Sequence, residues 1–380
     1  MDEKTWIFEA LKEKGIGFAM RVMSTYISGK LSKIEDIVKC SLCPNMCKFN
    51  CPTLLALGSE SHSPAGRARI AYYVKNRVLD PSFDNVTSLF TCIDCGACSI
   101  WCPFEYRVSE IISPVKSMID SKSFPKEIKD LVHSLSANKF LFKEKPDEKD
   151  REGEILFLRG CTARKFLPEL VDVTIELFDK LGLRLATSGD EGCCGFHAYS
   201  LGLYDLTRKL ANYNIDLLEK FKGSYAITLC PTLAYTFRVV YPKLGIKPQV
   251  KVYHVCEILP ELVKGKQLRK LDINVVVHDS GHLTRDLGFK GLSELVSVIP
   301  GISVRPPVWT GREVLDVAYY CSLLPFIDVD LALRIGEMRL SELYEFGDTF
   351  VVASPDAKLL FSKLGAEVYH VVELFHESLG

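Results

Sequence analysis

The sequence predicts an α+β protein of several domains, in which a helical, cysteine-rich part precedes two α/β units. Eight of the 14 cysteines fall between residues 40 and 102 of the 380-residue chain. A charged segment at residues 143–153, KEKPDEKDREG, then interrupts the apolar patterns and marks a domain boundary. Beyond it, short apolar runs typical of buried strands alternate with amphipathic stretches typical of helices, which predicts α/β structure.

Composition and charge exclude several classes of protein. Apolar residues make up 47% of the chain, enough for packed cores in more than one domain. The net charge of −1 gives no field that would favour nucleic acid, so no nucleic-acid partner is expected. The first residues, MDEKTWIFEALKEKG, lack the apolar core of a secretory signal, and no apolar run approaches the roughly 20 residues that span a bilayer. We expect a soluble, cytoplasmic protein whose cysteines bind metal rather than form disulfides.

The helical part is expected to begin with a segment of its own. Residues 5–27, TWIFEALKEKGIGFAMRVMSTYI, are apolar on one face, and we expect residues 1–35 to form an amphipathic helical segment. Such a segment serves as core or as a docking element for a partner, and its mixed charges weigh against a membrane anchor. Another helix is expected at residues 63–78, and helices continue to about residue 142.

The cysteines of the helical part form two runs. They read Cys40-x2-Cys43-x3-Cys47-x3-Cys51-Pro52 and Cys92-x2-Cys95-x2-Cys98-x3-Cys102-Pro103. The second run has the spacing of bacterial ferredoxins, in which three close cysteines wrap one cubane [4Fe–4S] cluster and the fourth ligates the other cluster. The fourth cysteine, which proline follows, is expected to begin a helix. We therefore assign two [4Fe–4S] clusters, one to Cys40, Cys43, Cys47 and Cys102 and the other to Cys92, Cys95, Cys98 and Cys51.

Two zinc ribbons are the alternative for these eight cysteines. Zinc ribbons use pairs of CxxC motifs rather than two runs of four cysteines, so the spacing favours iron–sulfur clusters. The first run departs from the ferredoxin spacing, because Pro44-Asn45-Met46 stands between its second and third cysteines where two residues are usual. A wider loop is expected there.

Four more cysteines follow the strands predicted beyond the charged segment. Strands are expected at residues 154–158, 183–187 and 224–229, with helices around 165–181 and 203–221. Cys161 follows the first strand, Cys193 and Cys194 follow the second, and Cys230 ends the third. Ligands of open α/β sheets gather at the carboxyl ends of the strands, so these thiols are expected to meet at one edge. Gly192 and Gly195 give the backbone the freedom to turn both adjacent thiols toward that site.

The pattern Cys161-x31-Cys193-Cys194-Gly195-x34-Cys230-Pro231 resembles the CCG domain of the heterodisulfide reductase family. That family includes iron–sulfur subunits of glycolate and lactate oxidases and of anaerobic glycerol-3-phosphate dehydrogenase. The segments CPTLLALGSESHSPAGR and LFTCIDCGACSIWCP are similar to its ferredoxin part. The resemblance implies a helical two-cluster ferredoxin-like domain at residues 36–145, a first α/β CCG-type repeat at 153–262 and a second, degenerate repeat at 270–380.

An internal repeat agrees with two such domains. KVYHVCEIL at residues 251–259 recurs as EVYHVVELF at 367–375. The cysteines of the first copy align with mostly different residues in the second: Cys161 with Gly281, Cys230 with Ser354, and the adjacent pair with Tyr320-Cys321. The second copy therefore keeps the fold signature and has lost nearly every ligand. We expect Cys256 and Cys321, which have no partners at ligand spacing, to be core residues.

The first copy has a gap as well. The family's motif ends in Cys-Pro-x-Cys and holds a five-cysteine, non-cubane cluster, but position 233 is Leu. The four remaining thiols leave three outcomes open: a third [4Fe–4S] cluster, a zinc ion, or inherited cysteines without metal. They are Cys161, Cys193, Cys194 and Cys230. We expect His197 to support these ligands rather than to bind metal itself.

No residue is assigned a catalytic role, because the chain has no GxGxxG after a strand, no P-loop and no nucleophile elbow. The resemblance implies an iron–sulfur electron-transfer subunit that relays electrons from a flavoprotein dehydrogenase, of hydroxy-acid or glycerol-3-phosphate type, toward a quinone or another carrier. The substrate chemistry would then belong to a partner, and a quinone-reducing partner would place the protein peripherally on the inner face of the membrane. Two alternatives are a heterodisulfide reductase-like subunit with thiol–disulfide catalysis at the CCG site, and a scaffolding subunit that carries a two-cluster relay.

Overall fold

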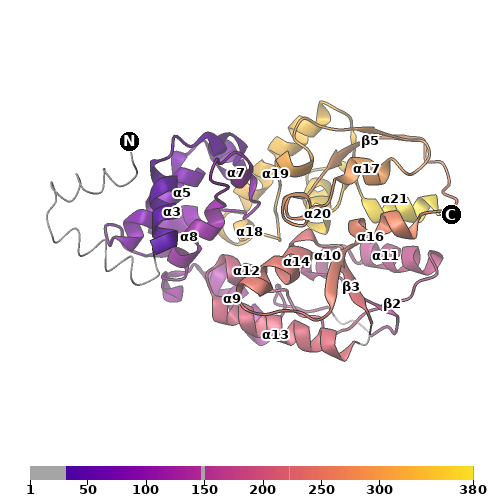
Figure 1. Ribbon diagram of the computed structural model, residues 1–380, viewed down its shortest axis with the longest axis horizontal. Helices are drawn as coiled ribbons and strands as arrows, with labels where there is room; N and C mark the ends of the chain where they lie inside the picture. The colour runs from indigo at the N-terminus through magenta and orange to yellow at the C-terminus, as the bar shows by residue number, and fades with distance from the viewer. Residues whose placement is uncertain (1–30, 147–149, 222, 380) are drawn as a thin grey trace, which may run out of the picture.

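The computed structural model describes residues 31–146, 150–221 and 223–379. The amphipathic segment expected at residues 5–27 lies outside the described residues. In Figure 1, a helical domain occupies one end of the molecule, and two α/β units lie beside each other at the other end. The helical domain contacts both units, so all three parts meet near the middle of the molecule's long axis. The fold is therefore the α+β, multidomain architecture that the sequence predicts.

The helical domain is built from short helices that surround the two cysteine runs. Its elements are α3 (Leu31–Leu42), η1 (Met46–Asn50), α4 (Pro52–Leu57), η2 (Glu60–His62), α5 (Pro64–Lys75), α6 (Phe83–Phe90), α7 (Ala97–Ile100), α8 (Val108–Lys116), η3 (Ser121–Ser123) and α9 (Lys126–Ala137). Helix α3 runs across the boundary predicted at residue 35. Helix α5 begins at Ser63, whose hydroxyl accepts a hydrogen bond from the Gly66 amide, and Pro64 in the first turn loses no helical bond. This central helix packs on α3 and on α8.

The first α/β unit carries a parallel sheet of four strands in the order β2-β1-β3-β4. Its elements are β1 (Ile155–Leu158), α10 (Cys161–Phe166), α11 (Pro168–Lys180), β2 (Leu185–Ala186), α12 (Phe196–Ser200), α13 (Tyr204–Lys220), β3 (Tyr225–Thr228), α14 (Pro231–Tyr235), η4 (Thr236–Val240), α15 (Tyr241–Lys243), β4 (Lys251–His254) and α16 (Val255–Leu262). The single helix expected around 165–181 is divided in two. Pro168 cannot continue α10 by backbone hydrogen bonding, so α11 starts there.

The second α/β unit repeats this topology, with strand order β6-β5-β7-β8. Its elements are β5 (Ile273–His278), η5 (His282–Asp286), α17 (Leu292–Val296), β6 (Ile302–Arg305), η6 (Gly311–Glu313), α18 (Leu324–Ile327), α19 (Val329–Tyr344), β7 (Thr349–Val352), α20 (Pro355–Lys363), β8 (Glu367–His370) and α21 (Val371–Ser378). The repeated YHV sequence ends β4 and β8, and in both units its histidine caps the next helix in a capping box. The repeat seen in the sequence is thus a repeat in three dimensions.

The two units share one hydrophobic core. It joins residues of the first sheet, such as Phe157 and Ile227, to Val277 and Phe375 of the second unit. Helices α11 and α21 pack on each other, and the Lys180 ammonium donates to the His376 carbonyl at 2.9 Å across the contact. Because the core is continuous, the loops at the carboxyl ends of both sheets are held at fixed positions relative to each other.

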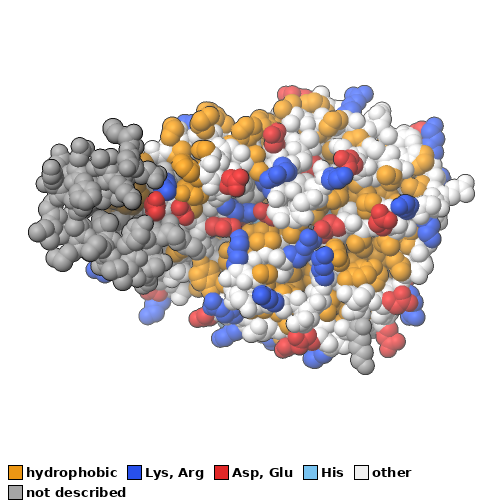
Figure 2. Space-filling model, in the orientation of Figure 1, with side chains coloured by type: hydrophobic (Ala, Val, Ile, Leu, Met, Phe, Trp, Pro, Cys, Tyr) orange, Lys and Arg blue, Asp and Glu red, His pale blue; other side chains and the backbone are white. Residues whose placement is uncertain are grey.

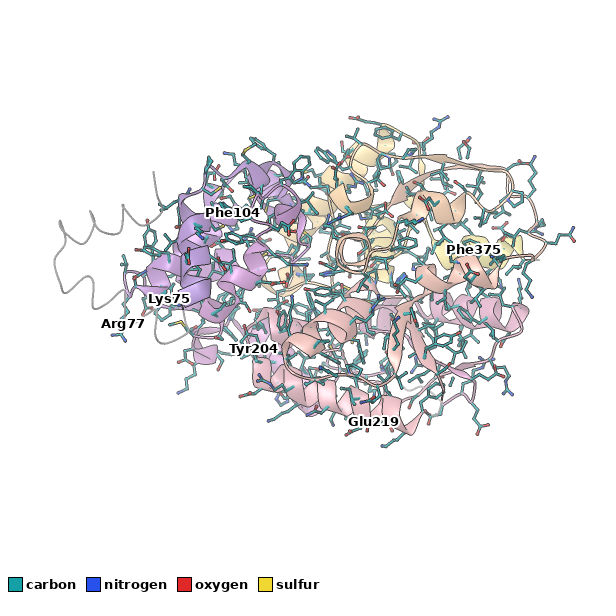
Figure 3. The ribbon with its side chains drawn as sticks, in the orientation of Figure 1. Lys75, Arg77, Phe104, Tyr204, Glu219 and Phe375 are labelled. Carbon is teal, nitrogen blue, oxygen red and sulfur yellow. The ribbon has the colours of Figure 1, made fainter. Side chains whose placement is uncertain are left out.

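The helical domain is joined to the first unit by a shared apolar cluster, which includes Val115 and Leu201, and by polar contacts. Tyr204, at the start of α13, points toward the helical domain and hydrogen-bonds Ser113 (Figure 3). On the face shown in Figure 2, basic and acidic side chains are interspersed over both units. Within the described residues, no helix combines the length and the apolar character needed to cross a lipid bilayer.

Candidate metal centres

The first cavity lies in the helical domain beneath the start of α5. Its lining includes four cysteines, namely Cys40, Cys43, Cys47 and Cys102. The extra residue of the first run is accommodated at Asn45, which adopts a left-handed conformation with φ of 67°. Its backbone amide donates to the Cys43 sulfur at 3.4 Å, and its side-chain oxygen accepts from the Ala65 amide at 3.4 Å. The wider loop is therefore tied to α5 rather than loose.

The second cavity lies on the other side of the α5 start. Its lining includes the other four cysteines of the two runs, namely Cys51, Cys92, Cys95 and Cys98. Pro64 and Val108 line both this cavity and the first. The structure thus brings each fourth cysteine to the three cysteines of the other run, which is the arrangement in the assigned sets.

The chain continues differently after each of the two fourth cysteines. Cys51 stands at the N-terminus of α4, as a helix start at a Cys-Pro step requires. The helix expected after Cys102 is not present, so that prediction is wrong. The Glu105 amide instead donates to the Cys102 carbonyl in a turn, with φ of 54° at Glu105, and α8 begins only at Val108. The turn lets the Val108 amide donate to the Cys98 sulfur at 3.4 Å.

A buried arginine faces the second cavity. The Arg67 side chain is 1% exposed, and its guanidinium donates to the Cys51 sulfur at 3.5 Å and to the Thr53 hydroxyl at 2.7 Å. Burial by itself would lower the pKa of Arg67, but the thiols of Cys92 and Cys51 raise it above its usual value. The sequence places Arg67 only as part of a helix, and its role at the cysteines emerges from the fold.

The chemistry of these donors fits iron–sulfur clusters. Burial, reinforced by neighbouring thiols, raises the pKa of Cys40 and of Cys47 to about 12, and burial raises that of Cys95 to about 12. The thiols without metal are therefore protonated at neutral pH, and metal binding displaces those protons. Within the described residues, no three or more His, Cys, Asp or Glu side chains are placed so that they could hold a single metal ion. The cysteines are instead distributed around cavities, to which each set contributes four thiols.

The third cavity lies where the carboxyl ends of the first unit's strands meet the second unit. Its lining includes the four cysteines singled out in the sequence and one more: Cys161, Cys193, Cys194, Cys230 and Cys321. The adjacent thiols are in contact, since hydrogen bonds with Cys161 and Cys194 raise the pKa of Cys193 well above its usual value. Gly195, with φ of 83°, supplies the turn that follows the pair, whereas Gly192, before the pair, does not have a positive φ.

Cys321 is not the core residue that the sequence predicted. Its sulfur lies 3.8 Å from the Cys230 sulfur, although the two residues are 91 positions apart. Cys256, in contrast, is fully buried in the shared apolar core. The alignment of Tyr320-Cys321 with the adjacent cysteine pair was the signal in the sequence, because it put Cys321 at a ligand position of the second repeat.

Two other residues named from the sequence also line the third cavity. The His197 Nε2 atom donates to the Tyr320 carbonyl at 2.8 Å, and burial lowers the pKa of His197 to about 4, so its ring is neutral. Leu233 is 4% exposed, and its amide donates to the Cys230 sulfur at 3.4 Å. His197 thus holds a neighbouring loop, while Leu233 contributes an amide but no thiol.

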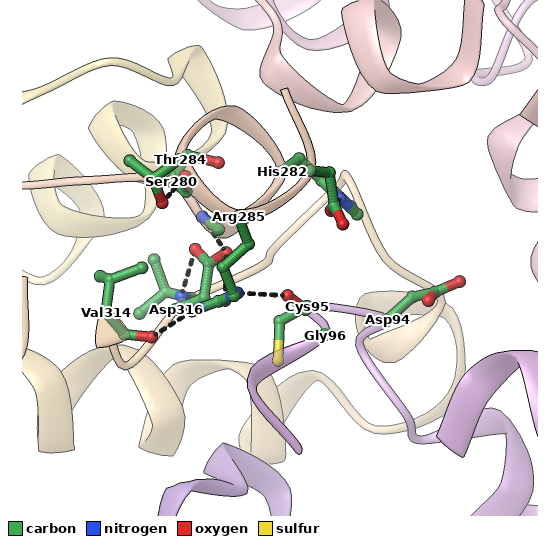
Figure 4. Close-up of polar contacts among 12 residues, drawn as sticks. Asp94, Cys95, Gly96, Ser280, His282, Thr284, Arg285, Val314 and Asp316 are labelled. Carbon is green, nitrogen blue, oxygen red and sulfur yellow. Dashed lines mark hydrogen bonds and ion pairs between the residues drawn. The ribbon is translucent and has the colours of Figure 1, made fainter. Parts of the chain in front are cut away.

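In the second repeat, the space beside the counterpart of Cys161 is occupied by protein side chains. A Cβ atom on Gly281, the counterpart of Cys161, would lie 1.9 Å from a guanidinium nitrogen of Arg285. That nitrogen pairs with the Asp316 carboxylate at 3.5 Å, and the carboxylate also accepts from the Gly281 amide at 2.6 Å (Figure 4). Arg285 also donates from Nε to the Cys95 carbonyl at 3.0 Å. The second repeat therefore has no room for a metal beside Gly281. Arg285 instead binds the backbone that lines the second cavity.

A bridging cavity lies between the second and third cavities. Its lining includes Cys95, which also lines the second cavity, and Cys321, which also lines the third. Thr232 and Asp356 line both the bridging and the third cavity. Cysteine sites that are far apart in the sequence are thus placed in a row.

Comparison with known proteins agrees with this division. Residues 36–106 match the 4Fe-4S dicluster domain, and residues 155–238 match the CCG cysteine-rich domain. These ranges contain the three cysteine sets that the sequence predicts. Cys321 lies outside both ranges.

Relatives align with more than half of the chain, and two of them are named as subunits of reductases. A subunit of the dihydromethanophenazine:CoB–CoM heterodisulfide reductase of Methanosarcina barkeri is 24% identical over 92% of this chain and 95% of its own. Lactate utilization protein A of an Exiguobacterium species is 23% identical over 58% of this chain and 95% of its own. A subunit of the CoM/CoB fumarate reductase of Methanothermobacter marburgensis is 23% identical over 71% of this chain and 56% of its own.

A solved structure shares the fold. A hypothetical protein from Helicobacter pylori superposes with a TM-score of 0.56 at 11% identity, over 98% of this chain and 76% of that protein. The chain therefore carries a 4Fe-4S dicluster domain and a CCG cysteine-rich domain, and the heterodisulfide reductase subunit and lactate utilization protein A are its homologues.

Proposed function

We propose that this protein is the electron-transfer subunit of an oxidoreductase complex and relays single electrons from a flavoprotein dehydrogenase toward a quinone or another carrier. Its character as an iron–sulfur subunit of such complexes follows from its domains and homologues. Two [4Fe–4S] clusters are held by the cysteines of the first and second cavities, and a third cluster by those of the third cavity. When bound, such a cluster accepts and releases one electron at a time without opening an iron to substrate.

The row of cavities is the observation that carries this proposal. The first and second cavities share lining residues, and the bridging cavity links Cys95 to Cys321. Around this row, buried side chains stabilise negative charge: Arg67 donates to the Cys51 sulfur, and Arg285 holds the Cys95 carbonyl. The cavities in this row would therefore provide a preorganised path for electrons from the first cavity, in the helical domain, to the third cavity, at the contact between the two units.

The choice of electron donor rests on the homologues. Lactate utilization protein A is named for lactate, a small hydroxy acid, and two other relatives are reductase subunits. A hydroxy-acid or polyol-phosphate oxidation releases two electrons as a pair, so a flavin that divides the pair is the partner chemistry that a one-electron relay requires. Isolation of the native complex under anaerobic conditions tests this, because a flavin-containing subunit is expected in stoichiometric amount. A native complex without flavin would contradict the proposed donor.

Metal content tests the number of clusters. The anaerobically purified full-length protein is expected to contain about twelve irons and as many sulfides per chain, three cubane equivalents. Cys194→Ser is expected to remove about four irons and to leave the electron paramagnetic resonance (EPR) signals of the helical domain unchanged. Cys95→Ser is the matched variant, because it should alter the helical-domain signals and spare the third site. About eight irons in the wild-type protein, or zinc in place of the missing four, would refute the third cluster.

Thiol–disulfide catalysis at the third cavity is the second candidate. It is favoured by the similarity to the heterodisulfide reductase subunit along nearly the full length of both chains. In that case, a mixed disulfide substrate should change the EPR spectrum of the third site under oxidising conditions, and Cys194→Ser should abolish the change. A third-site spectrum that no thiol or disulfide alters would leave electron relay as the function.

A further inference from the structure

We propose that Cys321 supplies a fifth thiolate to the cluster of the third cavity, so that the two repeats bind one iron–sulfur cluster together. This inference rests on the proposed third cluster and adds a ligand from outside the CCG motif. The first repeat contributes Cys161, Cys193, Cys194 and Cys230, and the second contributes the thiol that position 233 lacks.

The position of the Cys321 sulfur is the main observation. It lies 3.8 Å from the Cys230 sulfur, and both residues line the third cavity. Cys321 is partly exposed, whereas Cys256, the other cysteine without a predicted role, is fully buried among apolar side chains. Two neighbouring sulfurs at one cavity are typical of a metal site, whereas a cysteine in an apolar core is surrounded by carbon.

The loop that carries Cys321 is held in place by groups from three helices. The Asp356 carboxylate, at the start of α20, accepts from the Tyr319 amide at 2.6 Å and from the Cys321 amide at 3.1 Å. His197 of α12 donates to the Tyr320 carbonyl at 2.8 Å. The Tyr320 ring stacks on Phe166 of α10, with centroids 4.9 Å apart and planes 7° from parallel. Such anchoring keeps a ligand preorganised at low entropic cost.

The same geometry explains why the ligand comes from the second repeat. The Leu233 side chain packs in the apolar core of the first unit, and its amide already donates to the Cys230 sulfur. The second repeat has lost the other ligand positions of the motif, and Arg285 and Asp316 occupy the space beside Gly281. Its retained cysteine is free to serve the neighbouring site.

Five thiolates determine the class of cofactor. A structural zinc ion takes four ligands, and a cubane cluster takes one cysteine at each of its four irons. A fifth thiolate at one cavity would therefore exceed what a zinc ion or a cubane cluster uses, and it favours an iron–sulfur cluster with five cysteine ligands. We expect such a cluster to tie the two repeats together as well as to carry electrons.

The test compares four forms of the anaerobically purified full-length protein: wild type, Cys194→Ser, Cys321→Ser and Cys256→Ser. Iron, sulfide and Mössbauer spectra are measured for each. Cys321→Ser is expected either to lose the irons that Cys194→Ser loses or to keep them with an altered third-site spectrum. Cys256→Ser, the matched control, should resemble the wild type. A Cys321→Ser protein with wild-type metal content and an unchanged spectrum would overturn the inference.

A second measurement needs no variant, so it is unaffected if Cys321→Ser fails to fold. Anaerobic alkylation followed by mass spectrometry should find Cys321 protected in the iron-loaded wild type and modified after the iron is chelated. Equal modification before and after chelation, or a Cys230–Cys321 disulfide in the loaded protein, would contradict a ligand role. Failure of the third cluster itself is distinguishable, because the wild type would then contain only about eight irons.

Discussion

The guanidinium of Arg67 lies among the thiols of the second cavity, where no solvent screens its charge. We predict that Arg67→Gln lowers the reduction potential of the cluster held there, because the positive charge favours the reduced form. A unit charge about 7 Å away, at an effective dielectric constant of about 20, interacts by about 2 kcal/mol, which is on the order of 100 mV for one electron. EPR-monitored redox titration measures the shift.

Two variants serve as controls for Arg67. Arg67→Lys keeps the charge and should retain most of the potential, although it loses the forked hydrogen bonds to Cys51 and Thr53. Arg77→Gln removes an exposed charge just beyond α5 and should leave the potential unchanged. Equal potentials for Arg67→Gln and the wild type would show that the arginine serves only to pack the helical domain.

At the scale of elements, the start of α5 depends on a close backbone approach. A Cβ atom on Gly66 would lie 1.9 Å from the Glu60 carbonyl oxygen, which cannot move without displacing η2. We predict that Gly66→Ala sharply lowers the iron content of the helical domain, because the start of α5 lines both cavities there. Iron analysis of the anaerobically purified protein measures the loss.

The matched control for this prediction is Gly58→Ala. Gly58 has a positive φ, of 65°, but a Cβ atom there would meet nothing within 4 Å. The substitution should cost about 1–2 kcal/mol of backbone strain and leave the iron content intact. If both alanine variants lost iron equally, backbone conformation rather than the Gly66 contact would control the domain.

The capping histidines of the two repeats predict a pH dependence. Burial lowers the pKa of His254 to about 4 and that of His370 to about 3, and each Nδ1 atom accepts from a helix N-terminal amide. The unfolded chain takes up protons near pH 6.5 while the folded chain does not, so stability is full above that pH and falls as the pH drops toward 4. Each pH unit below 6.5 should remove about 1.4 kcal/mol per histidine.

Thermal unfolding of the holoprotein at pH 7 and pH 5 measures this effect. His254→Asn and His370→Asn keep a side-chain oxygen as helix cap and should each flatten the pH dependence. His133→Asn changes an exposed histidine of α9 and should not. A pH dependence that both capping variants leave unchanged would contradict the prediction.

At the scale of the whole molecule, Arg285 connects the second repeat to the helical domain. Its side chain is 2% exposed, pairs with Asp316 and donates to the Cys95 carbonyl. We predict that Arg285→Met costs about 3–5 kcal/mol, because it removes the cation that pairs with the buried Asp316 carboxylate. The pKa of Asp316 is already raised by burial and would rise further.

A double-mutant cycle separates charge from packing at this contact. Adding Asp316→Asn to Arg285→Met should recover part of the lost stability, because the unpaired charge is removed. Arg334→Met, an exposed position on α19, should change stability by no more than about 0.5 kcal/mol. The midpoints of thermal unfolding measure both effects. A double variant that recovers nothing would assign the loss to the hydrogen bonds of Arg285 with the Cys95, Arg312 and Val314 carbonyls.

Local patterns in the sequence predicted most of what short stretches of chain control. The strands and the repeat were predicted because apolar periodicity and the YHV sequence are local signals. The cysteine runs pointed to ligand sets because ligands a few residues apart are brought together by one loop. The division of α10 from α11 was missed, although Pro168 was visible, because a proline can also begin a turn of the same helix.

Only the tertiary structure decided how the ligand positions of the two repeats are used. Cys321 was expected in the core, but the shared hydrophobic core places its loop against Cys230, 91 residues earlier. Arg67 and Arg285 likewise acquire their roles from burial beside sulfurs and carbonyls that no local spacing predicts. Sequence spacing determines which groups one loop can present. The packing of one repeat on another determines which loops meet, because that contact is formed by apolar side chains distributed over the whole chain.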